Sequence, residues 1–231
     1  MTADRVTVAM QQAPPYRARP TEMCEHKGIG HPDTITDGTC ETAAQALAQA
    51  YRRTCGRVLH FNVDKGLLVA GRSEPRFGGG RVVEPAKLIV CGRASNPGGR
   101  LDVPSIVISA AERWLHQNIG TGTQHFRILP EVKEGSASLK QLYAGSAAVR
   151  RANDTSFGVG FAPLTALEQQ VLELAALLRS QPFHLAFPAA GDDFKIMGLR
   201  TGERHFLTVA LAMIDRHVSD VAHYCAICAI A

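Results

Sequence analysis

Lys27, His31 and Asp33 place a cation, a titratable imidazole and a hard oxygen ligand within one short stretch, K-G-I-G-H-P-D-T-I-T-D from 27 to 37. Its two glycines free the backbone, and its proline suits the first turn of a helix. The amino end of a helix favours an anion such as phosphate. Magnesium accompanies phosphate readily because it needs only one or two protein carboxylates. The stretch therefore predicts a site for phosphate with magnesium; the alternative is an ordinary glycine-rich turn before a helix.

Asp193 and Lys195 form a second candidate group, within G-D-D-F-K-I-M-G at 191–198. In an extended strand, residues two apart point to the same face of the sheet. A carboxylate and an ammonium group placed this way could bind a ribose hydroxyl and a phosphate. They could equally pair with each other at the end of a strand.

Two further polar stretches have weaker signals. Asp154 lies in N-D-T-S-F-G at 153–158, where the alternative is a capped turn, because such side chains often bond to nearby backbone. Gly135 and Ser136 follow Glu134 in a small turn that could accept an anion but has little specificity.

The elements that must position these groups begin with a helix over about 33–53, ended by Gly56. Arg57 to Val63 and Gly66 to Gly71 are rich in strand-forming residues and predict a hairpin around an Asp-Lys-Gly turn. Lys87 to Ala94 predicts a strand buried on both faces, and the apolar spacing from Val103 to Ile119 predicts a second helix.

The second half repeats this plan. Thr165 with Glu168 predicts a capping box ahead of a helix whose apolar face contains Leu167, Val171, Leu174, Ala175 and Leu178. Phe194–Leu199 and Phe206–Ile214 predict a hairpin around a Thr-Gly-Glu turn. A helix followed by a hairpin thus occurs twice, which indicates an α/β (α+β) fold of repeated units that pack helices against antiparallel sheets.

The composition excludes several classes of protein. The 231 residues are 45% hydrophobic and 20% charged, with a net charge of +4, as expected of a globular protein that does not span a membrane. Basic residues form no run and aromatic residues are only 6%, which disfavours nucleic-acid binding. Neither a signal peptide nor a membrane-spanning run is recognisable, so we expect a cytoplasmic protein. Cys225 and Cys228 form a single C-x-x-C, which is weak evidence for zinc or redox chemistry.

Taken together, these motifs resemble the archaeal-type S-adenosylmethionine synthetases. The resemblance runs almost collinearly from about residue 20 to residue 224 and is highly specific. It rests on K-G-I-G-H-P-D at 27–33, N-V-D-K at 62–65, F-G-G-G at 77–80, G-R-A at 92–94, A-N-D-T-S-F-G-V-G at 152–160, D-F-K-I-M-G at 193–198, and L-T-V-A with D-R at 207–216.

The resemblance implies a methionine adenosyltransferase that forms S-adenosylmethionine from ATP and L-methionine, releasing phosphate and pyrophosphate. It implies Mg²⁺ and K⁺, and active sites at the interface of a homodimer. By this resemblance, His31 assists departure of the triphosphate, which Lys195 also holds, and Asp33 binds magnesium. The resemblance assigns four further residues to ATP: Lys27, Gly135, Ser136 and Asp193. Of these, Asp193 contacts the ribose. It assigns Asp154 to methionine.

The chain also departs from the family pattern. Family members are longer, and their third repeat and a second basic, glycine-rich segment have no counterpart here. His26 stands where the family usually has arginine, and Phe61 where it has histidine. We expect an extended arm at 1–20, α/β units at 21–125 and 126–224, an apolar tail at 225–231, and no third unit. The alternatives to an active synthetase are an incomplete ATP-binding or regulatory partner of a full-length homologue, and a poorly folding remnant.

Overall fold

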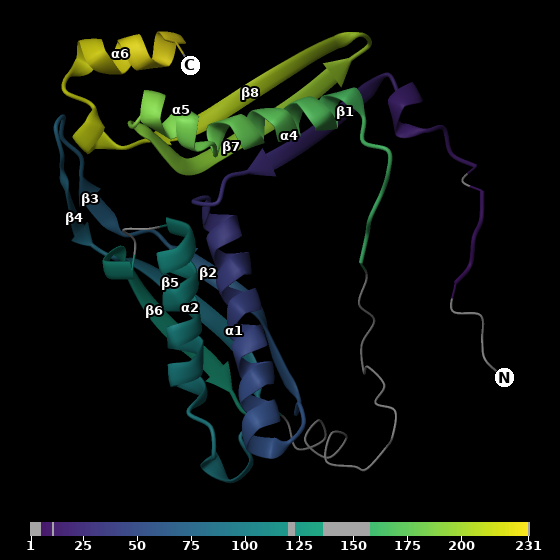
Figure 1. The fold of residues 1–231 in the computed structure, drawn as a ribbon, viewed down its shortest axis with the longest axis vertical. Coiled ribbons are helices and arrows are strands. Elements are labelled where there is room, and N and C mark those ends of the chain that lie inside the picture. Colours follow the sequence, from purple (N-terminus) through teal and green to yellow (C-terminus); the bar gives the residue numbers. More distant parts are fainter. Residues whose placement is uncertain (1–5, 11, 120–122, 136–157, 231) are drawn as a thin grey trace.

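The computed structural model describes residues 6–10, 12–119, 123–135 and 158–230. Over these residues it is a mixed α/β structure with two three-stranded sheets and one two-stranded sheet, arranged as in Figure 1. Within the described residues, no helix has the length and apolar character needed to cross a bilayer. The elements in chain order are η1 (Tyr16–Ala18), β1 (Thr21–Lys27), α1 (Pro32–Cys55), β2 (Phe61–Val69), β3 (Arg72–Glu74), β4 (Arg81–Glu84), β5 (Ala86–Ala94), η2 (Pro97–Gly99), α2 (Val103–Ile119), η3 (Thr123–His125), β6 (Phe126–Lys133), α4 (Ala166–Leu178), α5 (Gln181–Ala186), β7 (Ala190–Thr201), β8 (Arg204–Met213), η4 (Asp215–His217) and α6 (Val221–Ile230).

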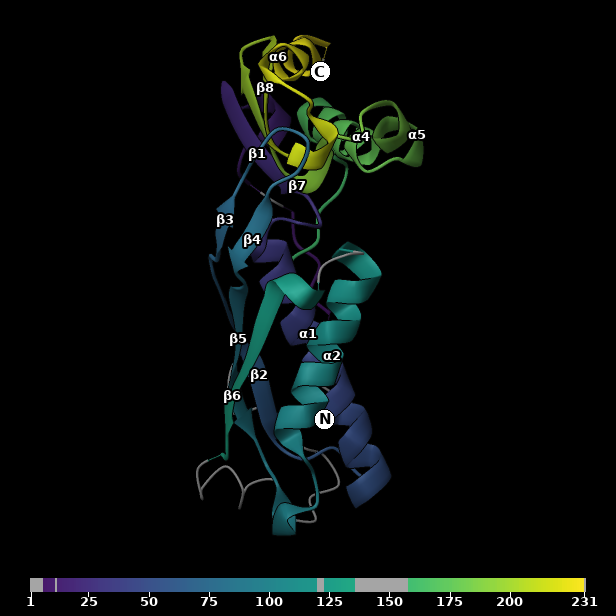
Figure 2. The same cartoon turned by 90° about the vertical axis from the view of Figure 1, so that its left-hand side faces the viewer.

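Helices α1 and α2 form a layer over one face of the sheet β2-β5-β6 (Figure 2). Both helices were predicted, and Gly56 ends α1 in the left-handed conformation with φ of 68°. Buried residues from both helices and the sheet form one apolar cluster, which includes Leu47, Leu88 and Leu115. This packing fixes the direction of α1 and therefore the place of its amino end.

Helix α4 covers one face of the second sheet, whose strand order is β1-β7-β8. The predicted capping box is confirmed: the Thr165 side chain accepts from the Glu168 amide, and the Glu168 side chain accepts from the Thr165 amide. The β7–β8 hairpin is also confirmed, with Gly202 in its turn at φ of 59°. No helix of the described residues covers the opposite face of this sheet, which we call its open face.

The hairpin predicted between Arg57 and Gly71 is wrong. Residues 61–69 form one strand, β2, with a bulge between Asn62 and Lys65. A Cβ on Gly66 would lie 2.9 Å from Thr36 Cβ, so this glycine permits the close approach of α1 rather than a turn. Because a glycine serves either purpose, the local sequence did not distinguish them.

Strand β5 is confirmed at Ala86–Ala94, but the prediction that it is buried on both faces is wrong. Leu88 and Val90 are buried beneath the helices, whereas Lys87 and Arg93, which lie on the other face, are exposed. The strand pairs with β2 antiparallel and with β6 parallel. Among the described elements, helices pack on one face of this sheet, and that face forms the core.

Strand pairing joins distant parts of the chain. Strand β1 pairs with β7, and β6 pairs with β5, so each of the two larger sheets contains strands from both sides of residue 125. The division into units at 21–125 and 126–224 stays a prediction. Asp215, just after β8, accepts from the amides of Arg76 and Gly80 at 3.2 and 2.8 Å and holds the β3–β4 loop against η4.

The division of the two chain ends into an arm and a tail stays a prediction. The described residues of the expected arm at 1–20, which include the short helix η1, lie exposed ahead of β1. The expected apolar tail is helical over its described residues 225–230, because α6 begins at Val221 and ends at Ile230. This helix contains Cys225 and Cys228. Both of these cysteines are exposed and free.

Candidate functional site

The loop between β1 and α1 lies directly against the start of β7. The Gly28 amide donates to the Phe194 carbonyl at 2.7 Å, and the Gly30 amide donates to the Asp192 carbonyl at 3.0 Å. A Cβ on Gly28 would lie 2.4 Å from that Asp192 oxygen, so only glycine allows the contact. The loop thereby brings the amino end of α1 beside Asp193.

His31 is the N-cap residue of α1. Its Nδ1 accepts from the Asp33 amide at 3.1 Å, and Pro32 occupies the first helical position. An accepting Nδ1 assigns the proton of the neutral ring to Nε2, which remains available as a donor. The imidazole therefore satisfies one of the unpaired amides that the sequence suggested for an anion, and presents an N–H of its own.

Two lysines and two carboxylates form a continuous chain beside this helix end. Lys27 and Lys195 are directly paired residues of β1 and β7. Glu25 bonds to both, at 2.6 Å to Lys195 and 3.3 Å to Lys27, and Lys27 also bonds to Asp33. We call these four residues with Asp193 the lysine cluster. Sequence reasoning missed Glu25, whose only signal was its position two residues before Lys27 on a strand.

These contacts set the charge states in the lysine cluster. The ammonium group of Lys195, followed by that of Lys27, lowers the pKa of the Glu25 carboxyl. The bond to Lys27 lowers the pKa of Asp33, and Asp33 in turn raises the pKa of Lys27. Partial burial raises the pKa of the Asp193 carboxyl, and His31 opposes that shift. The lysine cluster therefore contains two ammonium groups and three carboxyl groups.

Asp193 and Lys195 share one face of β7, as predicted from strand geometry. Phe194 and Ile196, which alternate with them, are buried against α4. Lys195 and Asp193 therefore belong to the open face of the sheet. Instead of pairing with Asp193, Lys195 pairs with Glu25 from the neighbouring strand.

The other predicted site residues are not part of this cluster. Gly135 follows β6, where a Cβ would lie 3.2 Å from His60 Nδ1, and β6 runs away from β1 and the amino end of α1 (Figure 1). Ser136 and Asp154 lie outside the described residues. The structure thus brings together Lys27, His31, Asp33, Asp193 and Lys195 and leaves Gly135 at the opposite end of α1.

The carboxylates of the lysine cluster suit a magnesium ion that is shared with phosphate. Asp33 and Glu25 are exposed oxygen donors, and magnesium takes one or two such ligands beside phosphate and water. Within the described ranges, no three His, Cys, Asp or Glu side chains gather as a complete protein cage. No group of described residues identifies a potassium site, so potassium stays a prediction.

Comparisons with known proteins agree with the motifs. A family model described as S-adenosylmethionine synthetase (AdoMet synthetase) matches residues 4–230. The S-adenosylmethionine synthase of Methanothermobacter marburgensis is 42% identical over 214 residues, covering 91% of this chain and 53% of that protein. The S-adenosylmethionine synthase of Caldivirga maquilingensis is 41% identical over 233 residues, covering 96% of this chain and 57% of that protein. A solved structure of an S-adenosylmethionine synthetase from Campylobacter jejuni has 16% identity and a TM-score of 0.48. The match covers 85% of this chain and 49% of that one. The chain spans about half the length of the curated relatives it matches.

Proposed function

Because the chain belongs to the S-adenosylmethionine synthetase family, we propose that it is a methionine adenosyltransferase that binds MgATP at the lysine cluster. In this reaction the methionine sulfur attacks C5′ of ATP, the bond from C5′ to its oxygen breaks, and triphosphate leaves with that electron pair. The triphosphate is then hydrolysed to phosphate and pyrophosphate. The observation that carries the proposal is that the loop and β7 assemble two lysines, His31 and three carboxylates at one helix end.

The charges of the cluster favour metal-bound over free ATP. With two ammonium groups against three carboxylates, the cluster alone would not attract a free triphosphate. Asp33, with Glu25 beside it, would hold magnesium, which when bound supplies positive charge to the triphosphate oxygens. We therefore expect that ATP binds measurably only when magnesium is present.

His31 and the residues of the lysine cluster each have a role that suits their position. His31 Nε2 donates toward the oxygen that leaves C5′ and stabilises its growing charge. Lys27 and Lys195 exchange their contacts with Glu25 and Asp33 for phosphate oxygens. Asp193 accepts from ribose hydroxyls. Such a displacement needs alignment and charge stabilisation more than covalent help from the protein.

A homodimer would complete the site. Gly135, assigned to ATP by the resemblance, lies at the opposite end of α1 from Lys195. If Gly135 and Lys195 both contact one nucleotide, they must therefore come from two different subunits. The open sheet face that carries the lysine cluster also carries Met23 and Phe206, whose exposed fractions are 56% and 51%. Exposed apolar side chains beside a charged site are typical of a subunit interface.

The test is formation of S-adenosylmethionine from ATP and methionine, with magnesium and potassium present. His31→Asn is the informative variant, because asparagine still caps α1 through its side-chain oxygen but is too short to place an N–H donor where His31 Nε2 lies. We expect its rate to fall at least about a hundredfold, the usual contribution of a positioned proton donor. His116→Ala, an exposed histidine on α2, is the matched control and should keep full activity.

A second candidate is an ATP-binding partner of a full-length homologue, favoured by the separation of Gly135 from the cluster. It predicts no product from this chain alone, but magnesium-dependent ATP binding in calorimetry. Lys195→Ala should abolish that binding, whereas Lys133→Ala, an exposed lysine paired with Glu131, should not. A purified, folded chain that gives neither product nor ATP binding would exclude both candidates.

A further inference from the structure

A groove runs along the outer side of the helical layer, where α1 and α2 pack against each other. Small buried residues, including Ala43 and Ala110, let the two helices approach closely. Ala46 and Ile106 line the groove, which has a volume of about 480 Å³. Its backbone walls belong to two packed helices, so the core beneath fixes the spacing of the residues that line it.

The groove is rich in hydrogen-bond donors that have no partner in the described part of the chain. Gln49 and Arg53 line it from α1, and Ser109 and Arg113 from α2. None of these four side chains makes a hydrogen bond or an ion pair with any described residue. Two guanidinium groups, one amide and one hydroxyl therefore face the same space with their donors available.

The carboxylate that lines the groove, that of Asp102, is already hydrogen-bonded within its own helix start. Asp102 accepts from the Ser105 amide at 3.2 Å and from the Ser105 hydroxyl at 2.7 Å, at the start of α2. These bonds, the hydroxyl first, lower the pKa of Asp102. Asp102 therefore stays ionised as a local cap, and the two guanidinium groups lack an ion-pair partner in the described part of the chain.

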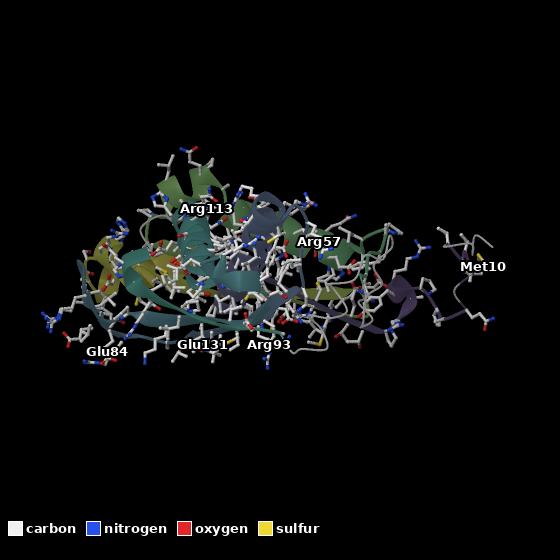
Figure 3. The ribbon with its side chains drawn as sticks, turned by 90° about the horizontal axis from the view of Figure 1, so that it is seen from below. Met10, Arg57, Glu84, Arg93, Arg113 and Glu131 are labelled. Atoms are coloured by element: carbon white, nitrogen blue, oxygen red, sulfur yellow. The ribbon has the colours of Figure 1, made fainter. Side chains whose placement is uncertain are left out.

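We propose that this groove between α1 and α2 binds an oligophosphate, with Arg53 and Arg113 as its main contacts. The planar guanidinium fork matches two phosphate oxygens at once, and Gln49 and Ser109 add neutral donors between the arginines. The site is separate from the lysine cluster, which lies at the amino end of α1, whereas Arg53 is in the last turn. Figure 3 shows Arg113 on the helical side of the molecule, away from Glu131 and Arg93.

The proposal does not depend on the proposed enzymatic activity, and its test separates the two sites. Inorganic pyrophosphate is titrated into the Lys195→Ala variant, which removes a cation from the lysine cluster. Trp114, the single tryptophan of the chain, is next to Arg113 and reports binding by its fluorescence. We expect saturable binding that weakens at least tenfold when Arg53→Ala and Arg113→Ala are added.

Arg52→Ala is the matched control, because Arg52 is exposed in the same helical turn but does not line the groove. It should change the affinity less than twofold. The charge-preserving pair Arg53→Lys and Arg113→Lys should bind more weakly than the parent, since lysine lacks the fork. Unchanged thermal melting would show that each variant is folded.

Equal weakening by Arg52→Ala and by the groove variants would overturn the proposal, because it would indicate diffuse attraction to positive charge. Absence of saturable pyrophosphate binding would also overturn it, as would a poly-glutamate peptide that binds more tightly than pyrophosphate. ATP titrated in the same way identifies the source of the phosphate groups. Affinity equal to pyrophosphate indicates a free phosphate ligand, and tighter binding indicates a nucleotide.

Discussion

Arg200→Met should destabilise the protein by about 3–5 kcal/mol, the usual cost of removing one partner of a buried ion pair. Glu22 on β1 is only 2% exposed, and Arg200 Nε on β7 donates to it at 3.0 Å. Arg200 also donates to the carbonyls of Arg19 and Gly202, but these bonds are exposed, so water can replace them. The loss therefore comes mainly from the buried Glu22 charge, whose remaining side-chain bond within the described residues is the one from the Thr165 hydroxyl.

Equilibrium unfolding in urea measures this loss as a change in the free energy of unfolding. The double variant Glu22→Gln/Arg200→Met should recover more than half of it, because glutamine still accepts from Thr165 and carries no charge. Arg204→Ala, an exposed arginine at the start of β8, should cost less than about 0.5 kcal/mol. A loss below about 1 kcal/mol for Arg200→Met, or no recovery in the double variant, would refute the reasoning.

Three further predictions concern the packing and the β3–β4 loop. Gly38→Ala should cost about 1–3 kcal/mol and shift the tryptophan fluorescence, because its Cβ would lie 2.3 Å from the Trp114 ring; an unchanged spectrum and stability would contradict this packing. Tyr51→Phe should cost about 1–3 kcal/mol in urea unfolding, because the buried hydroxyl donates to the Ser95 carbonyl at 2.6 Å; a neutral effect would mean that water reaches that carbonyl. Two amides of the loop lower the pKa of Asp215, so its stabilising effect is present above the ordinary aspartate pKa of about 4 and is lost as the pH falls through the lower folded value. Melting temperatures between pH 5 and pH 2 should therefore fall more steeply for the wild type than for Asp215→Asn, and parallel curves would exclude this contribution.

The sequence by itself determined the features that depend on neighbouring residues. The spacing of apolar residues predicted α1, α2 and α4, and a four-residue signal predicted the capping box of Thr165. Lys27, His31 and Asp33 lie within one loop and helix start, so their proximity follows from local geometry. The motifs around them also indicated the family, which the comparisons confirm.

Only the tertiary structure decided which distant segments meet. Pairing of β1 with β7 places Glu25 between Lys27 and Lys195, and no local pattern indicates that contact. Gly66 gave the same signal as a turn glycine, although it serves the close approach of α1 to β2. Gly135 is remote from the lysine cluster because β6 pairs with β5 and runs away from it. Strand pairing of this kind follows from the packing of whole layers, whereas sequence periodicity records only the surroundings of each element.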